Sequence, residues 1–260
     1  MIAAGIDVGS LSAEAVLIKN RKVLGYSVVP TGADSRKAAE AALEAALSKT
    51  PYTKQDIGFT VATGYGRINV PYADRQVTEI TCHARGAIYE YQDTRTVIDI
   101  GGQDSKVIKL DASGMVVDFT MNDKCAAGTG RFLEVMARAL EVDLEDLSTL
   151  AQKARRASNI SSTCTVFAES EVVSLIGKGT PREEIAQGLI NSVADRTVNM
   201  VHRVGLTREV TMTGGVAKNA GVVRAIQERL GVEVRVPPEP QIIGALGAAL
   251  LAWNEVSKRL

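Results

Sequence analysis

One strand-and-turn pattern occurs twice in this chain, and it constrains the fold more than any other feature. An apolar strand ends in Asp7-Val8-Gly9-Ser10 and is followed by a hairpin that runs to about Val29. The same order returns at Asp99-Ile100-Gly101-Gly102, with further strands expected over 106–110 and 115–121. A repeated supersecondary unit indicates two halves of related architecture. We therefore expect two lobes that face each other across a cleft.

The segments between and after the two hairpins alternate between strand and helix patterns, which is typical of an α/β fold. We expect strands over 58–63, 209–212 and 232–236, and helices over 35–47, 77–89, 128–140, 144–153, 165–176, 181–204, 217–230 and from Pro240 to the end. We place the first lobe at residues 1–94 and the second at 95–242, and we expect the last helix, 243–260, to complete the first lobe.

Charge and composition exclude several classes of function. The chain has 30 basic and 30 acidic residues, so it offers no electrostatic footprint for nucleic acid or for an anionic membrane. The first residues lack the basic region of a signal peptide, and the longest uncharged stretch, 240–254, is shorter than the ~18 apolar residues that a membrane span requires. Three cysteines cannot form a disulfide framework. We expect a cytoplasmic protein with reduced thiols.

Three glycine turns follow apolar strands, at Asp7-Val8-Gly9-Ser10, Asp99-Ile100-Gly101-Gly102 and Thr213-Gly214-Gly215. Any one of them is more often a plain turn than a ligand site, but three together favour phosphate binding, since backbone N–H groups next to glycine can approach phosphate oxygens. The two aspartates at equivalent strand ends suit Mg²⁺, which prefers one or two carboxylates plus waters. The sequence contains no P-loop motif.

Two of the three cysteines lie where polar, glycine-rich segments lead into predicted helices. Cys125 precedes one helix and Cys164 precedes another, and a helix start favours a thiolate or an anionic metal–sulfur centre. We interpret Cys82, inside a helical pattern, as a small buried side chain, and both histidines, His83 and His202, as isolated. Two cysteines from each chain of a symmetric dimer would supply four thiolates, the complement of a 4Fe-4S cluster.

The three glycine turns together resemble those of the actin/Hsp70/sugar-kinase ATPases. That resemblance implies a two-lobed actin-like (ribonuclease H-like) fold with bound ATP or ADP and Mg²⁺, and it leaves both strand-end aspartates as candidates for the ion. It assigns Asp7, Gly9, Ser10, Leu11 and Ser12 to a first phosphate hairpin, Asp99, Gly101 and Gly102 to a second, Gln103 and Asp104 to orienting the attacking water, Gly214 and Gly215 to the adenosine pocket, and Gln241 to the nucleotide pocket.

A narrower resemblance rests on both cysteine segments and on the second and third glycine turns. Asn-Asp-Lys-Cys-Ala-Ala-Gly-Thr-Gly-Arg-Phe-Leu (122–133) and Ser-Ser-Thr-Cys-Thr-Val-Phe-Ala-Glu-Ser-Glu (161–171) resemble the activator component of 2-hydroxyacyl-CoA dehydratases, within the BadF/BadG/BcrA/BcrD ATPase family. The similarity covers essentially the whole chain. It implies a homodimer that holds one 4Fe-4S cluster on Cys125 and Cys164, takes an electron from ferredoxin or flavodoxin, and uses ATP to pass it to the dehydratase.

One residue departs from that resemblance. The chain has Glu14 where related sequences often have Lys, and Lys106 in the second hairpin is a candidate to replace that cation. Three other functions stay open at this point. The first is an ATPase subunit of a benzoyl-CoA-reductase-like complex. The second is a small-molecule kinase, which would be indifferent to both cysteines, and the third is a filament-like ATPase, which would polymerise with nucleotide.

Overall fold

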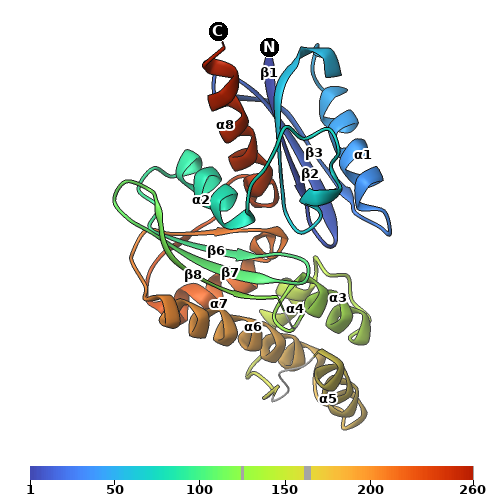
Figure 1. Cartoon of the computed structure of the whole chain (residues 1–260). Coiled ribbons are helices and arrows are strands. Elements are labelled where there is room, and N and C mark those ends of the chain that lie inside the picture. Colours follow the sequence, from blue (N-terminus) through green and yellow to red (C-terminus); the bar gives the residue numbers. More distant parts are fainter. Residues whose placement is uncertain (124–125, 161–164, 260) are drawn as a thin grey trace.

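Two five-stranded sheets form the framework of the computed structural model, which describes residues 1–123, 126–160 and 165–259 (Figure 1). The first sheet has the order β3-β2-β1-β4-β5, with β1 (Ile2–Val8), β2 (Ser12–Lys19), β3 (Lys22–Pro30), β4 (Ile57–Thr63) and β5 (Arg75–Gln76). The second has the order β8-β7-β6-β9-β10, with β6 (Thr96–Ile100), β7 (Ser105–Leu110), β8 (Val116–Asn122), β9 (Val210–Thr213) and β10 (Val234–Arg235).

The two sheets have the same topology. Each begins with a three-stranded antiparallel meander, and the first strand of each meander then pairs in parallel with a strand that follows a helical crossover. Asp7 lies opposite Glu14 in the first meander, and Asp99 lies opposite Lys106 in the second. The repeated hairpin of the sequence is therefore a repeated half of the fold.

Helices cover both sheets and fill the space between them. Helix α1 (Ser35–Leu47) packs on the outer face of the first sheet, and α6 (Arg182–Val204) and α7 (Ala220–Leu230) pack on the outer face of the second. Helices α2 (Glu79–Glu90) and α8 (Ile243–Ser257) share one core cluster with residues of both sheets. Figure 1 shows α8 and α1 on opposite sides of the first sheet.

The last helix is apolar around most of its circumference because it is surrounded by protein. It contacts β1, β2, β4 and α2, although the second sheet separates it from them in the sequence. A Cβ atom at Gly5 in β1 would lie 2.0 Å from the carbonyl oxygen of Ala245, so glycine permits this close approach of strand and helix. The lobe boundaries proposed from the sequence stay a prediction.

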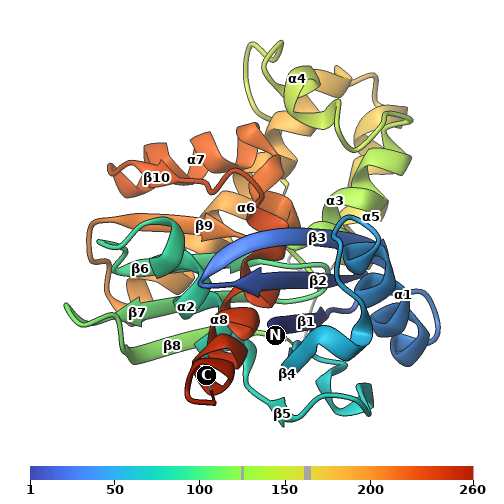
Figure 2. The ribbon, with the colours of Figure 1, turned by 90° about the horizontal axis from the view of Figure 1, so that it is seen from above.

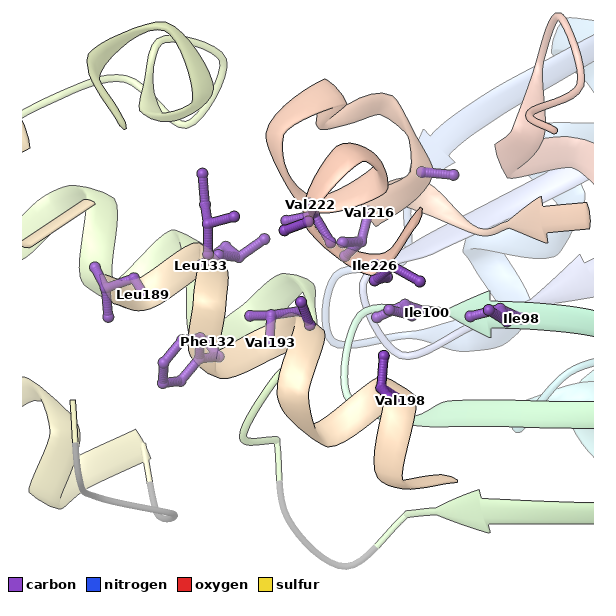
Figure 3. Close-up of a cluster of buried hydrophobic side chains, with 14 of the residues drawn as sticks. Ile98, Ile100, Phe132, Leu133, Leu189, Val193, Val198, Val216, Val222 and Ile226 are labelled. Atoms are coloured by element: carbon purple, nitrogen blue, oxygen red, sulfur yellow. The ribbon is translucent and has the colours of Figure 1, made fainter. Parts of the chain in front are cut away.

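The second half carries extra helices, α3 (Gly130–Ala139), α4 (Leu147–Ala151) and α5 (Thr165–Gly177), before α6. Figure 2 shows α3 and α4 projecting beyond the edge of the sheets. Phe132 and Leu133 of α3 join Leu189 and Val193 of α6 in the core of this half (Figure 3), which fixes α3 to the second sheet.

Most predicted elements agree with the structure, and the differences have local causes. Helix α7 begins at Ala220 because Gly215–Lys218 forms a 3-10 turn and the side chain of Asn219 caps the helix at the N–H of Val222. The sequence pattern did not predict β5, which has only two residues. Within the part of the chain that the structure describes, no helix is both long and apolar enough to cross a membrane.

Candidate functional site

The turns of the two hairpins touch each other at the edge where β1 and β6 end. In the first turn the N–H of Gly9 donates to the carbonyl of Ser12 at 2.9 Å, and in the second the N–H of Gly101 donates to the carbonyl of Asp104 at 3.0 Å. A Cβ atom at Gly102 would lie only 2.6 Å from Cγ of Leu11. The two predicted phosphate hairpins therefore face each other, and a side chain at position 102 would displace Leu11.

Asp99 in the second hairpin is held on both of its carboxylate oxygens. The hydroxyl of Thr213 donates to Oδ1 at 2.9 Å, and Nζ of Lys106 donates to Oδ2 at 3.1 Å. Burial alone would raise the pKa of Asp99, but nearby His83 and Lys106 and the Thr213 hydrogen bond bring it below its ordinary value. The carboxylate is thus a stable anion that the protein itself neutralises.

Lys106 is the cation of this cluster. Its Nζ lies 3.1 Å from Asp99, 2.7 Å from Asp104 and 3.4 Å from Glu79 in α2, and its side chain is only 3% exposed. Burial would lower the pKa of Lys106, but the three carboxylates raise it well above its usual range. Lys106 is committed to these carboxylates, so the structure gives no support for a free cation that replaces a lysine at position 14.

Asp7 in the first hairpin has a different environment. Among the described residues, the nearest side chain that can pair with it is His83, whose Nε2 lies 3.9 Å from Oδ2, beyond hydrogen-bonding distance. The backbone of two glycines lies close against the carboxylate of Asp7. A Cβ atom added to Gly244 would lie 1.9 Å from Oδ2 of Asp7, and one added to Gly64 would lie 2.3 Å from Oδ1. Burial raises the pKa of Asp7 to about 6, and nearby Glu79 and Asp99 also act in that direction against His83 and Lys106.

Glu14 in β2 lies opposite Asp7 of β1 and is also buried. Burial, followed by the charge of Asp7, raises the pKa of Glu14 well above its ordinary value. The amide of Gln241 donates to the hydroxyl of Ser12 at 3.1 Å and to Oε1 of Glu14 at 3.4 Å. Gln241 therefore joins the first hairpin to the segment that precedes α8.

The Gly214-Gly215 turn lies against the second hairpin. Gly214 has a positive φ of 86°, and a Cβ atom there would lie 2.4 Å from the carbonyl oxygen of Ile100 and 2.8 Å from Oδ1 of Asp99. Its N–H donates to the carbonyl of Pro240 at 2.9 Å. The third glycine turn thus lies against the second hairpin and next to Gln241, which contacts the first hairpin.

The structure brings together most of the predicted phosphate-site residues, and it adds three. Asp7, Asp99 and Asp104, the first two turns and Gly214-Gly215 form one region, while Gln103 is exposed at its edge. Sequence reasoning gave no role to the side chains of His83, Glu79 and Thr213. Only the i, i+4 spacing of Glu79 and His83 on one helix could have indicated that they share a face.

The region that carries the cysteines is joined to the second hairpin by backbone hydrogen bonds. At the start of α3 the N–H of Gly130 donates to the carbonyl of Gly101 at 2.9 Å, and the N–H of Arg131 donates to the carbonyl of Gly102 at 2.8 Å. Helices α3 and α5, which follow Cys125 and Cys164 in the sequence, contact each other. The two cysteines themselves lie outside the described residues.

The described parts of the chain, 1–123, 126–160 and 165–259, contain no group of three or more His, Cys, Asp or Glu side chains arranged to hold a metal ion. A magnesium ion that is bound mainly by waters and nucleotide phosphates does not need such a group. Of the two strand-end aspartates, Asp7 is the candidate for such an ion, since both oxygens of Asp99 already have partners from the chain.

Comparison with known proteins adds to this geometry. The sequence pattern of the BadF/BadG/BcrA/BcrD ATPase family matches residues 4–252. The chain is 51% identical over 260 residues to an activator of lactoyl-CoA dehydratase from Anaerotignum propionicum, covering 100% of both sequences. It is 48% identical to an (R)-2-hydroxyglutaryl-CoA dehydratase activating ATPase from Acidaminococcus fermentans, covering 98% of both.

Solved structures agree with the fold. The activator of the 2-hydroxyisocaproyl-CoA dehydratase from Clostridium difficile, with bound ADPNP, superimposes with a TM-score of 0.94 at 45% identity and covers 100% of this chain and 97% of its own. A ROK-family glucokinase from Streptomyces griseus matches with a TM-score of 0.60 at 13% identity, covering 98% of this chain and 100% of its own, which shows a shared fold alone. The predicted actin-like fold and the family resemblance are confirmed.

Proposed function

The chain belongs to the BadF/BadG/BcrA/BcrD ATPase family and is an ATPase, and from this premise we propose that it activates a 2-hydroxyacyl-CoA dehydratase by ATP-driven transfer of single electrons. Full-length identity of 51% and 48% to two activators of such dehydratases supports the choice of partner. Sugar kinases share only the fold, at 13% identity, which carries no information on substrate.

The observation that carries this proposal is the pair of hydrogen bonds between the second hairpin and α3. The carbonyls of Gly101 and Gly102 accept from Gly130 and Arg131, and Cys125 lies just before these residues in the sequence. A nucleotide phosphate that moves the hairpin would therefore move the start of α3. Phe132 and Leu133 are packed in the core, so α3 would move as a rigid body with the hairpin.

We assign the cluster to Cys125 and Cys164 of two identical chains. Four thiolates from a homodimer complete a 4Fe-4S site, which supplies reversible one-electron chemistry at low potential. Residues that follow Cys164 support a second copy at this end of the molecule, because Val166 and Phe167 are 66% and 67% exposed although they are large and apolar. Exposed apolar side chains of this kind mark protein contacts.

In the nucleotide site we assign Asp7 to the water shell of Mg²⁺ and Asp99 to the support of the second hairpin. Asp104 and Gln103 are the candidates to orient the attacking water, and Gly214 and Gly215 are the candidates for the adenosine side. Gln241 acts on the nucleotide site indirectly, because its hydrogen bonds to Ser12 and Glu14 hold the first hairpin. We further propose that the protein is cytoplasmic and that ferredoxin or flavodoxin reduces it. We also propose that the boundary between the two lobes lies between residues 94 and 95.

The experiment that tests this function is purification without oxygen, followed by iron and sulfide analysis, electron paramagnetic resonance and the ATP-dependent activation of an added 2-hydroxyacyl-CoA dehydratase. We expect Cys125→Ala and Cys164→Ala each to abolish bound iron and activation while ADP binding is kept. Cys82→Ala is the matched control, since Cys82 is buried in α2 among apolar residues, and burial raises the pKa of its thiol to about 12. Iron-free wild-type protein that activates the dehydratase fully would contradict the proposal.

A further inference from the structure

A buried histidine lies between the two aspartates that end β1 and β6. Nδ1 of His83 is 3.1 Å from the hydroxyl of Thr213 and 3.3 Å from Oδ1 of Asp99, and Nε2 on the other side of the ring is 3.9 Å from Oδ2 of Asp7. We propose that His83 is a positioning residue that holds Asp7 and Asp99, which belong to different sheets, in the relative position that ATP hydrolysis requires. The proposal rests on the roles proposed above for the two aspartates, and it is independent of the cluster.

The location of His83 explains how one ring can reach both sheets. Helix α2 shares its core cluster with strands of the first sheet and of the second. His83 is 6% exposed, and Glu79, one turn earlier, reaches Lys106 at 3.4 Å. The same face of α2 therefore contacts Lys106 through one side chain and Asp99 through another, so the helix is fixed to the second hairpin at two points.

The contact with the first hairpin is different in kind. The 3.9 Å between Nε2 and Asp7 is roughly 1 Å longer than an N–H···O hydrogen bond. The first turn of α8 closes this region, since a Cβ atom at Gly244 would lie 2.9 Å from Nε2 and 1.9 Å from Asp7. A shift of roughly 1 Å between α2 and the end of β1 would bring Nε2 within hydrogen-bonding distance of Asp7. His83 would then contact both aspartates directly.

A buried histidine with satisfied polar partners often has only a packing role, so a positioning role needs further geometric support. Imidazole has two nitrogen atoms on different sides of its ring, and here each lies within 4 Å of a carboxylate of a different phosphate hairpin. Thr213, which Nδ1 also contacts, immediately precedes the Gly214-Gly215 turn. His83 thus touches or closely approaches a residue of each of the three glycine turns, an arrangement that core packing alone does not require.

The test compares His83→Asn and His83→Gln with the wild type. Asn places an amide nitrogen near the position of Nδ1, and Gln places one near Nε2. His202→Asn is the control, because His202 is the other histidine of the chain and is exposed in the last turn of α6. The measurements are kcat and KM for ATP, the Mg²⁺ concentration at half-maximal rate, and the midpoint of thermal unfolding.

We expect both His83 variants to lose roughly 10- to 100-fold in kcat, as residues that orient metal-site ligands typically do, and to need more Mg²⁺. KM for ATP at saturating Mg²⁺ should change little, because His83 is proposed to act through the two aspartates and not to contact the nucleotide. Retention of wild-type kcat, or a loss that only follows the fraction unfolded, would overturn the proposal.

A second pair of variants keeps the proposal testable if the His83 variants do not fold. Thr213→Val removes the hydroxyl that Nδ1 contacts, and Thr213→Ser keeps it. We expect Val to lower kcat and Ser to restore it, and equal rates for the two would overturn the proposal. Iron content separates this test from the test of the proposed function. Iron-loaded His83→Asn protein with wild-type turnover would refute the positioning role of His83 alone. Iron-free wild-type protein would refute the proposed electron-transfer function alone.

Discussion

The two phosphate hairpins share one topology but differ in the charge of the residue that lies opposite the strand-end aspartate. Asp7 faces Glu14 across the first hairpin, whereas Asp99 faces Lys106 at the equivalent position of the second. Burial raises the pKa of Asp7 to about 6, while Asp99 stays below its ordinary pKa in spite of burial. Two equivalent backbones thus have opposite electrostatics.

This difference indicates a division of labour. The second hairpin is neutralised by its own lysine and is tied by backbone hydrogen bonds to α3, so it can act as a structural unit that transmits movement. Among the described residues, the buried carboxylate of the first hairpin has no lysine or arginine within 4.0 Å, and such a group is stabilised when a metal ion binds. The following variants break or sharpen that comparison, from the largest expected effect to the smallest.

Asp7→Asn should have the largest effect, and it should act on turnover. The charge stabilisation from a bound metal ion is worth several kcal/mol, so we expect ATP hydrolysis to fall by about two orders of magnitude or more. Stability at neutral pH should not fall, because the charged form of Asp7 is the one that burial disfavours. Steady-state ATPase assays and urea unfolding test both statements, and turnover close to that of the wild type would refute the assignment of Asp7.

Lys106→Met should have its main effect on stability. The substitution leaves Asp99, Asp104 and Glu79 without their shared cation in a buried site, and we expect a loss of about 3–5 kcal/mol in the free energy of unfolding. Urea denaturation without nucleotide measures it. A loss below about 1 kcal/mol, the range of exposed ion pairs, would show that the cluster does not stabilise the second hairpin.

The two aspartates should give opposite pH dependences of stability in the absence of nucleotide and Mg²⁺. The folded pKa of Asp7 is raised, so its contribution is present below the ordinary value of 3.8 and is lost as the pH rises through about 6. The folded pKa of Asp99 is lowered, so its contribution is present above the ordinary value and is lost as the pH falls through the folded pKa.

Unfolding curves from pH 4 to pH 7 for Asp7→Asn and Asp99→Asn measure this difference. Relative to Asp7→Asn, the wild type should lose stability as the pH rises, whereas relative to Asp99→Asn it should not. Parallel curves for the two variants would contradict the asymmetry.

Glu14→Gln should have the smallest effect. Gln keeps an oxygen that accepts from the amide of Gln241 and removes a carboxyl group whose pKa is already raised by burial and by Asp7. We expect the free energy of unfolding at pH 7 to change by no more than about 1 kcal/mol, the net worth of one hydrogen bond. The equivalent position in the second hairpin is Lys106, so a change as large as that of Lys106→Met would remove the contrast.

Local patterns were sufficient to predict the repeat, the α/β class and most element bounds. Helix α1 was predicted over 35–47 and is observed as Ser35–Leu47, since apolar spacing and a capping Asp34 define it within the segment itself. The partners of Lys106 and the role of His83 were not predictable. Thr213 lies far from His83 in the chain, and only the packing of α2 between two sheets brings them together.

A crystal structure with Mg²⁺ and ADPNP would test the division of labour most directly. The account predicts that the water shell of the ion contacts the carboxylate of Asp7, while Nζ of Lys106 stays on Oδ2 of Asp99 as it is here, at 3.1 Å. An ion bound to Asp99 with Lys106 displaced, and Asp7 left without contact to the ion or its waters, would contradict the account.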